Sequence, residues 1–385
     1  MFHPPLHDPA TYRALEETVG AFARDVIRPV AEALDREERF PAEIHASMAE
    51  LGLFGVTVPE ALGGAGLDSL AYSIVMEELS RGYASIADQC GLVELIGTLL
   101  SVHGTPGQQA RHLPGILGAT TRVAYCITEE EAGSDVAGIR SVATRDGAGW
   151  RLDGSKLWIH NAPIADLGFV LARTDPEAGH RGMSIFIVDL NAPGVTRGPK
   201  ERKLGQRASQ VGGLRFENVA LSGDALLGEA GRGFHIMMGV LEKGRVGIAA
   251  LATGIAQAGL DAALGYSSER RQFGRAIGEN QGLRWMLANM AKDIAAARAL
   301  TRDAALRIDH GLPAGRAASI AKCFASDMCV ARTSDALQVF GGCGYIRGVE
   351  VERLYRDARI TQIYEGTNQI QRDIIARSLF RDGAR

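Results

Sequence analysis

Residues Ile363–Gln371 read Ile-Tyr-Glu-Gly-Thr-Asn-Gln-Ile-Gln and set one carboxylate, Glu365, between an apolar, strand-like run and the expected start of a helix. Gly366 permits a sharp turn, and Thr367 or Asn368 can cap the helix that follows. A carboxylate that is fixed at such a turn and partly desolvated can serve as general base toward a weakly acidic carbon. On this stretch alone, a carboxylate that only favours the helix dipole is the simpler interpretation.

The composition indicates a globular protein of two or three domains. The chain has 385 residues, of which 46% are hydrophobic and 23% charged. A net charge of −3 and the lack of a long basic run argue against nucleic-acid binding, and the locally basic segment Arg197–Lys203 is expected to be a solvated loop. Residues Met1–Ala10 lack a signal-peptide pattern, and no apolar run looks long enough to cross a membrane. The expected location is cytoplasmic.

The cysteines argue against disulfides and against a metal site. There is no CxxC pair and no His partner at metal-ligand spacing. Five reduced thiols are therefore expected, several of them in the core: Cys90, Cys126, Cys323, Cys329 and Cys343.

The chain divides into a helical, a β-rich and a second helical part. Apolar periodicity predicts helices over 12–36, 41–51, 67–80 and 85–103 in the first part, with Pro29 bending the first of them. The middle part has short β-type runs, with Asp153-Gly154 as a turn signal, and predicts a small barrel-like domain.

Long Ala-rich helices are expected in the last part over 234–267, 281–310 and 313–340, packed as a four-helix bundle. Ala and Gly on more than one helix face suggest contacts with further subunits. The predicted fold is an α+β multidomain protein: an N-terminal helical domain (1–120), a central β-barrel-like domain (121–232) and a C-terminal helical bundle that carries Glu365 (233–385).

Six short motifs follow one another along this plan, and each alone is weak. They are Tyr125–Asp135 (Tyr-Cys-Ile-Thr-Glu-Glu-Glu-Ala-Gly-Ser-Asp), Gly154–Asn161, Lys203–Ser209, Arg270–Gly274, Gln338–Gly342 with Arg356-Asp357 beyond it, and Tyr364–Thr367. Because all six motifs occur in this order, the chain resembles, over nearly its whole length, the acyl-CoA dehydrogenase family of flavoproteins. The resemblance is to its short-chain, medium-chain or short branched-chain types.

The resemblance implies FAD as the cofactor. It places the strand end Tyr125, Cys126, Ile127 and Thr128, together with Trp158, Ile159 and His160, beside the flavin ring. Backbone groups and a Thr hydroxyl can hydrogen-bond the ring edge, and an indole can cover one ring face. Taken without the resemblance, these residues would be an ordinary buried strand and a core tryptophan.

Further contacts are implied at the rest of the cofactor and at the substrate. Ser134 would meet the cofactor and the pantetheine arm of the substrate, although a turn residue is the simpler interpretation. Residues that would contact the FAD of a neighbouring subunit are Arg270, Gln272, Phe273, Gln281, Gln338, Val339, Gly341 and Gly342. Thr367 and Gln369 would contact the adenosine side within the subunit that carries Glu365. No GxGxxG motif follows a strand, so FAD is not held as in nicotinamide enzymes.

The implied reaction is the dehydrogenation of an acyl-CoA thioester to the trans-2-enoyl-CoA. Glu365 removes the α-proton, flavin N5 accepts the hydride, and an electron-transfer flavoprotein receives the electrons. Glu242, Arg245, Gly366 and Ser134 are the expected substrate contacts. The implied oligomer is a tetramer, a dimer of dimers.

One feature favours Glu365, and others leave the substrate open. Some family members carry the base just before the Arg that matches Arg245, and this chain has Gly244 there. Four positions depart from the family pattern, namely Glu130-Glu131 for Pro-Gly, His160 for Thr or Ser, Cys343 for Asn, and Glu350 for Pro. An acyl-CoA oxidase, a dehydrogenase of a carrier-bound or unusual acyl group, and a non-catalytic relative are therefore alternatives.

Overall fold

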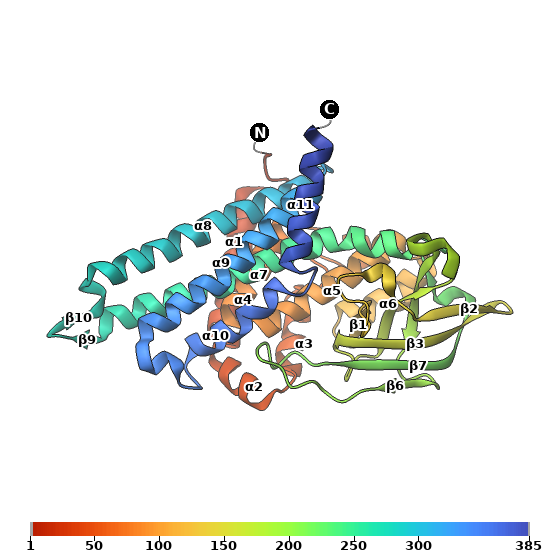
Figure 1. Cartoon of the computed structure of the whole chain (residues 1–385), viewed down its shortest axis with the longest axis horizontal. Helices are drawn as coiled ribbons and strands as arrows, with labels where there is room; N and C mark the ends of the chain where they lie inside the picture. Colours follow the sequence, from red (N-terminus) through yellow and green to blue (C-terminus); the bar gives the residue numbers. More distant parts are fainter. Residues whose placement is uncertain (1–2, 384–385) are drawn as a thin grey trace.

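The computed structural model describes residues 3–383, with side chains described for residues 3–380. Figure 1 shows an elongated molecule in which helices from both ends of the chain pack together, with the sheet domain beside them. The helices of the first part are α1 (Pro9–Phe22), α2 (Ala31–Glu37), α3 (Ala42–Glu50), α4 (Ser69–Gly82), α5 (Ala84–His103) and α6 (Pro106–Leu117).

The helix expected over 12–36 is present but irregular in its middle. A π turn (Ala23–Ile27) and a 3₁₀ turn (Arg28–Val30) join α1 to α2, so the distortion falls at Pro29, which cannot donate a helix hydrogen bond. Helix α6 was not expected. Its signal is the capping box in which the Thr105 hydroxyl and the Gln108 side chain each accept the other's backbone N–H.

The central strands form one sheet that folds back on itself. They are β1 (Val123–Cys126), β2 (Val142–Asp146), β3 (Gly149–His160), β4 (Leu167–Arg173), β5 (Met183–Asp189), β6 (Val195–Arg197), β7 (Val211–Leu221) and β8 (Leu226–Leu227). Their order is β6-β7-β3-β2-β4-β5-β8, with β1 paired to β4. The rings of Trp150 on β3 and Phe186 on β5 lie 5.2 Å apart. Strands three places apart in a flat sheet would be about 14 Å apart, so the sheet is curled and barrel-like.

The prediction of a turn at Asp153-Gly154 is wrong. Strand β3 runs through both residues, and the pairing with β7 shifts register between Leu152 and Gly154. Gly154 has φ 142°, and a Cβ there would lie 2.4 Å from the Ser141 hydroxyl. The glycine therefore marks an irregularity inside a strand, where another segment comes close.

The last part is a helical bundle built around one long helix. It contains α7 (Gly233–Glu269), α8 (Gln281–Asp309), α9 (Gly315–Phe340), α10 (Glu350–Ala358) and α11 (Asn368–Gly383). Helix α7 packs against α8 and α9 and also against α4 and α5 of the first part. Helices α4 and α7 cross closely at Gly254, which has no side chain. A Cβ at this position would lie 2.0 Å from Ser80 Oγ. Two distant thirds of the sequence thus share one core.

The prediction of a strand-like run before Glu365 is wrong. Residues Arg359–Gln362 form a 3₁₀ turn, and Ile363 has φ −111° and ψ −56°. Periodicity cannot separate a strand from a helical turn in so short an apolar run.

Two helices correct the expectation about membrane-crossing length. Both α5 and α7 are long and apolar enough to cross a membrane, but 72% and 83% of their most apolar stretches are buried inside the protein. Their apolar character is therefore accounted for by the core.

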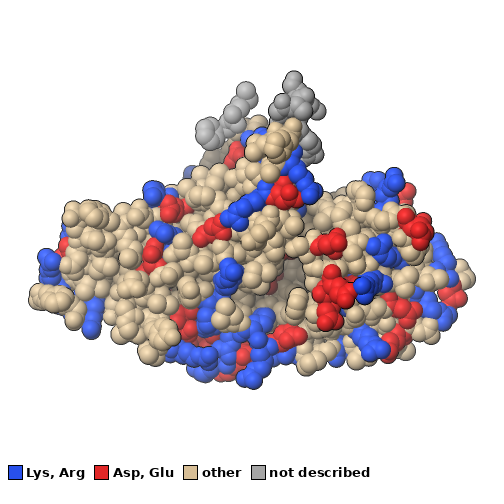
Figure 2. All heavy atoms as spheres, viewed as in Figure 1, with Lys and Arg blue, Asp and Glu red and all other residues tan. Residues whose placement is uncertain are grey.

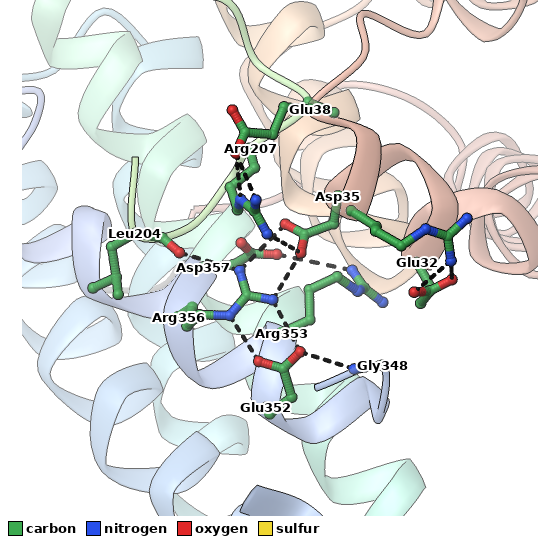
Figure 3. Close-up of polar contacts among 12 residues, drawn as sticks. Glu32, Asp35, Glu38, Leu204, Arg207, Gly348, Glu352, Arg353, Arg356 and Asp357 are labelled. Carbon is green, nitrogen blue, oxygen red and sulfur yellow. Dashed lines mark hydrogen bonds and ion pairs between the residues drawn. The ribbon is translucent and has the colours of Figure 1, made fainter. Parts of the chain in front are cut away.

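A cluster of ion pairs joins the three parts of the chain (Figure 3). Asp35 at the end of α2 lies 2.7 Å from Arg356 of α10 and 3.5 Å from Arg207 of the loop before β7. Arg356 also pairs with Glu352 at 2.7 Å, and Arg207 pairs with Glu38. The side chains of both arginines are largely buried, so each guanidinium needs its carboxylate partners.

We predict that Arg356→Ala lowers the free energy of unfolding by about 2–4 kcal/mol, because Asp35 and Glu352 lose a largely buried partner. The matched control is Arg24→Ala, which removes an exposed pair with Asp25 and should change the free energy of unfolding far less. Denaturant unfolding of both variants measures the difference. Equal losses would contradict the assigned role of the cluster.

Candidate active site

Glu365 sits on a tight loop whose backbone is fixed from two sides. Glu365 and Gly366 have φ 55° and 84°, and a left-handed non-glycine residue is a strained conformation that its surroundings must hold. Lys322 Nζ donates to the Gly366 carbonyl at 2.8 Å, and Gln371 Nε2 donates to the Glu365 and Gly366 carbonyls at 3.1 Å and 3.0 Å. The Thr367 hydroxyl then caps α11, accepting the N–H of Ile370 at 3.3 Å.

Lys322 is a site residue that the sequence analysis missed. Its side chain is fully buried in α9, and its ammonium group is also held by Asn368 Oδ1 at 3.0 Å. Burial lowers its pKa to about 8, with the Glu365 charge opposing that shift. A lysine between Ala321 and Cys323 in an otherwise apolar stretch was the available signal.

The Glu365 carboxylate is desolvated, and its Oε2 has no hydrogen-bond partner among the described residues. The residue as a whole is partly exposed, but this oxygen is buried. Burial raises the pKa of Glu365 to about 7, whereas Arg245 lowers it, Asp88 raises it and Lys322 lowers it. Arg245 is itself buried on α7 with an unpartnered Nε, and burial lowers its pKa. Such a carboxylate can accept a proton near neutral pH.

Gly244 makes the room that Glu365 occupies. A Cβ at this position of α7 would lie 2.7 Å from Glu365 Oε2 and 3.3 Å from Leu95 Cδ2. Position 244 therefore faces the Glu365 carboxylate directly, and any side chain there would displace it.

The strand end expected at the flavin ring offers mainly backbone groups. Cys126 and Ile127 are buried in the core, and the Tyr125 hydroxyl donates to the Met237 carbonyl at 3.2 Å. Thr128 is partly exposed just past β1, and its carbonyl accepts the Leu157 N–H at 2.9 Å.

Trp158 stands out of the sheet at an irregular point of β3. Its φ is 53°, it lies in the register shift between Lys156 and Ile159, and 61% of it is exposed. Its indole is therefore free to cover a flat ring. Ile159 points the other way and packs in the sheet core, which leaves only its backbone for a cofactor contact.

A buried ion pair that the sequence analysis missed fixes this strand end. Lys156 Nζ donates to the Ile127 carbonyl at 2.8 Å and to Glu129 Oε1 at 2.7 Å. Glu129 also accepts from the Ser141 hydroxyl at 2.6 Å. Lys156 lies inside the motif Gly154–Asn161, but nothing in the sequence links it to Glu129.

His160 belongs to a polar cluster with α5. Its Nε2 lies 2.8 Å from the Gln89 side-chain nitrogen and its Nδ1 lies 3.2 Å from Asp88 Oδ2. Gln89 and Asn161 exchange a pair of amide hydrogen bonds at 3.0 Å and 2.9 Å. Burial lowers the pKa of His160, against the Asp88 charge.

The remaining residues of the first motif lie at the surface. Ser134, Glu130 and Glu131 are all exposed, and Glu131 pairs with Arg140. The added negative charge therefore sits outside the buried site. Glu242, expected at the substrate, is half-buried on α7, one turn before Arg245.

The residues expected to serve a neighbouring subunit are not near Glu365. Arg270, Gln272 and Phe273 form an exposed hairpin, β9 (Arg271–Gln272) with β10 (Arg275–Ala276), and Phe273 is 99% exposed at its tip. Figure 1 shows this hairpin at one end of the molecule and β1 toward the other. Gln281, Gln338, Gly341 and Gly342 are also exposed, while Val339 is buried. Of the two residues expected at the adenosine side of the cofactor in the subunit that carries Glu365, Gln369 is exposed and Thr367 is half-buried. One subunit does not bring the hairpin and the β1 end together.

The residues present fit a bound FAD. An exposed indole, a strand end with backbone groups and exposed arginines are the donors and the stacking surface that such a cofactor requires. Within residues 3–383, no group of three His, Cys, Asp or Glu side chains could hold a metal ion. All five cysteines are free, and only Cys343 among them is exposed.

Figure 2 shows a hollow in the face it displays, between the helical part and the sheet domain. Two other hollows, of about 490 and 390 Å³, are lined mainly by charged residues of the helical surface and do not include Glu365. The chemistry of the side chains, rather than hollow size, therefore locates the site.

We predict that Glu365→Gln stabilises the fold at pH 8. A carboxyl pKa raised from 4.5 to about 7 penalises folding above pH 7 and not below about 4.5, so the gain should be about 1–3 kcal/mol at pH 8 and should vanish toward pH 4.5. Denaturant unfolding across this range measures it, with the exposed Glu130→Gln as control. A gain that does not depend on pH would show that the carboxylate carries no such penalty.

Three family models match the chain in succession: the acyl-CoA dehydrogenase N-terminal domain over residues 9–120, the middle domain over 124–219 and the C-terminal domain over 231–380. The short-chain specific acyl-CoA dehydrogenase of Bos taurus mitochondria is 42% identical, over 97% of this chain and 91% of that protein.

Two solved structures share the fold. Butyryl-CoA dehydrogenase from Megasphaera elsdenii has a TM-score of 0.94 at 35% identity, covering 98% of this chain and 100% of that one. A chain from a structure described as the electron transferring flavoprotein of Acidaminococcus fermentans has a TM-score of 0.95 at 39% identity, with the same coverage. With the resemblance thus confirmed, the chain belongs to the acyl-CoA dehydrogenase family of FAD-dependent flavoprotein oxidoreductases.

Proposed function

We propose that this enzyme converts an acyl-CoA thioester to its trans-2-enoyl form with Glu365 as the base. The observation that carries the proposal is the buried Glu365 Oε2, which has no hydrogen-bond partner within the part of the chain that the structure describes and belongs to a carboxyl whose pKa burial raises to about 7. A short acyl chain is favoured by the similarity to the short-chain and butyryl-CoA enzymes.

Glu365 would take the α-proton of the thioester at Oε2. A carboxylate with a pKa near 7 is a stronger base than an ordinary one and is still ionised in a large fraction at neutral pH. Arg245 and Lys322 keep it partly ionised before the transfer, and burial favours the neutral acid afterwards. Bound FAD supplies the acceptor for the hydride that leaves the β-carbon.

The backbone at the base can also bind the thioester oxygen. Among the described residues, the Glu365 N–H, which follows the 3₁₀ turn, donates to no acceptor. A donor fixed at this point stabilises the negative charge that develops on the oxygen as the α-proton leaves. Gly366 adds a second backbone segment at the same place.

The cofactor would be shared between subunits. The β1 end, Trp158 and the backbone near His160 would hold the flavin ring, with Ser134, Thr367 and Gln369 along the rest of the molecule. Exposed residues at the other end of the bundle, Arg270 and Phe273 among them, would reach the FAD of a partner. This arrangement favours a dimer as the minimal unit and a tetramer as the assembly.

An electron-transfer flavoprotein is the proposed electron acceptor. The similarity to a chain in the Acidaminococcus fermentans electron transferring flavoprotein structure supports this partner. A cytoplasmic location remains a prediction.

Glu365→Gln should retain FAD and bind acyl-CoA, but anaerobic addition of butyryl-CoA should no longer bleach the flavin absorbance. The wild-type enzyme should bleach under the same conditions. Bleaching at an unchanged rate in the variant would rule out Glu365 as the base.

Gly244→Ala should slow flavin reduction roughly 10- to 100-fold, because its Cβ would press on the Glu365 carboxylate and misplace it. The control is Gly265→Ala in the same helix, where a Cβ would meet nothing within 4 Å. That variant should reduce at the wild-type rate. Stopped-flow absorbance measures both, and equal rates in the two variants would contradict the contact.

A further inference from the structure

One face of helix α5 leads from the Glu365 carboxylate toward the segment expected at the flavin. Leu95 Cδ2 lies 3.3 Å from the point where a Gly244 Cβ would stand, which is itself 2.7 Å from Glu365 Oε2. Asp88 precedes Leu95 by seven residues, two helical turns, so it lies on the same face about 10 Å away. Its carboxylate approaches His160 at 3.2 Å.

The Asp88 carboxylate approaches His160 through Oδ2, while its other oxygen, Oδ1, accepts no hydrogen bond from the described residues. The Asp88 side chain is 17% exposed, and His160 is its one close polar contact among the described residues. Glu94, farther along the same helix, provides a contrast. It accepts the Thr57 N–H at 3.2 Å and the Thr57 hydroxyl, and lies 3.7 Å from Lys243. Buried carboxylates normally accept several such hydrogen bonds from the protein.

His160 does not neutralise Asp88. The Gln89 amide nitrogen donates, so the His160 Nε2 that it approaches at 2.8 Å must accept. The Asn161 side-chain nitrogen also donates to the Val123 carbonyl at 3.4 Å, and this bond sets the orientation of both amides of the reciprocal Gln89–Asn161 pair. The imidazole is therefore neutral, with its proton on Nδ1 facing Asp88. Burial lowers the pKa of Lys203 and the Asp88 charge opposes that shift, so this ammonium is the nearby positive charge, but it donates its hydrogen bond to the Ser209 carbonyl rather than to Asp88.

This arrangement disfavours a plain alkyl chain. An alkyl group that reached Asp88 would remove water from the carboxylate and would offer no donor in return, which is unfavourable. An N–H or O–H group on the acyl chain would replace that water. If Asp88 served only to orient His160, a neutral acceptor would suffice and no carboxylate with a second, unpaired oxygen would be needed.

We propose that Asp88 is a substrate-recognition residue, which accepts a hydrogen bond from an amino or hydroxyl substituent on the acyl chain of the thioester. The proposal rests on the proposed function and narrows its substrate class. His160 holds the Asp88 side chain in place, and Glu365 acts on the α-carbon of the same acyl group.

The test uses the FAD-loaded Glu365→Gln variant, in which binding is measured without turnover. Dissociation constants are measured by calorimetry for butyryl-CoA and for its 3- and 4-hydroxy and 3- and 4-amino derivatives. At least one substituted thioester should bind about tenfold or more tighter than butyryl-CoA. Adding Asp88→Asn, which keeps the shape, or Asp88→Leu should abolish the preference, and Asp88→Leu should bind butyryl-CoA more tightly. The exposed Glu130→Gln is the control and should change nothing.

Two results overturn the proposal in distinguishable ways. If butyryl-CoA binds as tightly as every substituted thioester and bleaches the wild-type flavin, the dehydrogenase assignment stands and Asp88 only orients His160. The same conclusion follows if both Asp88 variants leave all affinities unchanged. If no thioester binds or bleaches the flavin, both the proposed function and this inference fail.

Discussion

A carboxylate held out of water without a partner is the constraint on which this structure depends. Unpaired, Glu365 Oε2 is costly to bury, and the loop that carries it has a strained backbone. Lys322 and Gln371 hold the backbone of that loop, and Gly244 leaves the space. Each of these residues acts on the position of one oxygen, so the packing of α7, α9 and α11 serves the chemistry of the site.

Hydrogen bonds connect the contact between the three parts of the chain to the loop that carries Glu365. Asp357, beside the ion-pair cluster of Figure 3, accepts the backbone N–H of Gln206, and the Gln206 side chain donates to the Tyr364 hydroxyl at 3.3 Å. Tyr364 immediately precedes Glu365 in the chain. A disturbance where α2, α10 and the loop before β7 meet would therefore reach the loop that carries Glu365 through two hydrogen bonds.

The sequence predicted the features that depend on local pattern. Helical periodicity gave α7, α8 and α9 nearly to the residue, and the order of six motifs led to the family and its three-part plan. Local signals failed where tertiary contacts decide. Gly154 looked like a turn but lies in a strand against Ser141, and the run before Glu365 looked like a strand but forms a 3₁₀ turn. The sequence could not reveal the roles of Lys322, the Lys156–Glu129 pair and Asp88, because each role depends on contacts with residues distant in sequence.

The measurement that tests this account most directly is the pH dependence of anaerobic flavin reduction at low substrate concentration. Under that condition the rate reports the ionisation of the free enzyme. The account predicts a rate that rises with pH to a plateau, with a midpoint near 7 that reflects Glu365. A rate that stays constant from pH 5.5 to 8.5, about 1.5 units on either side of that midpoint, would contradict a desolvated Glu365 as the base.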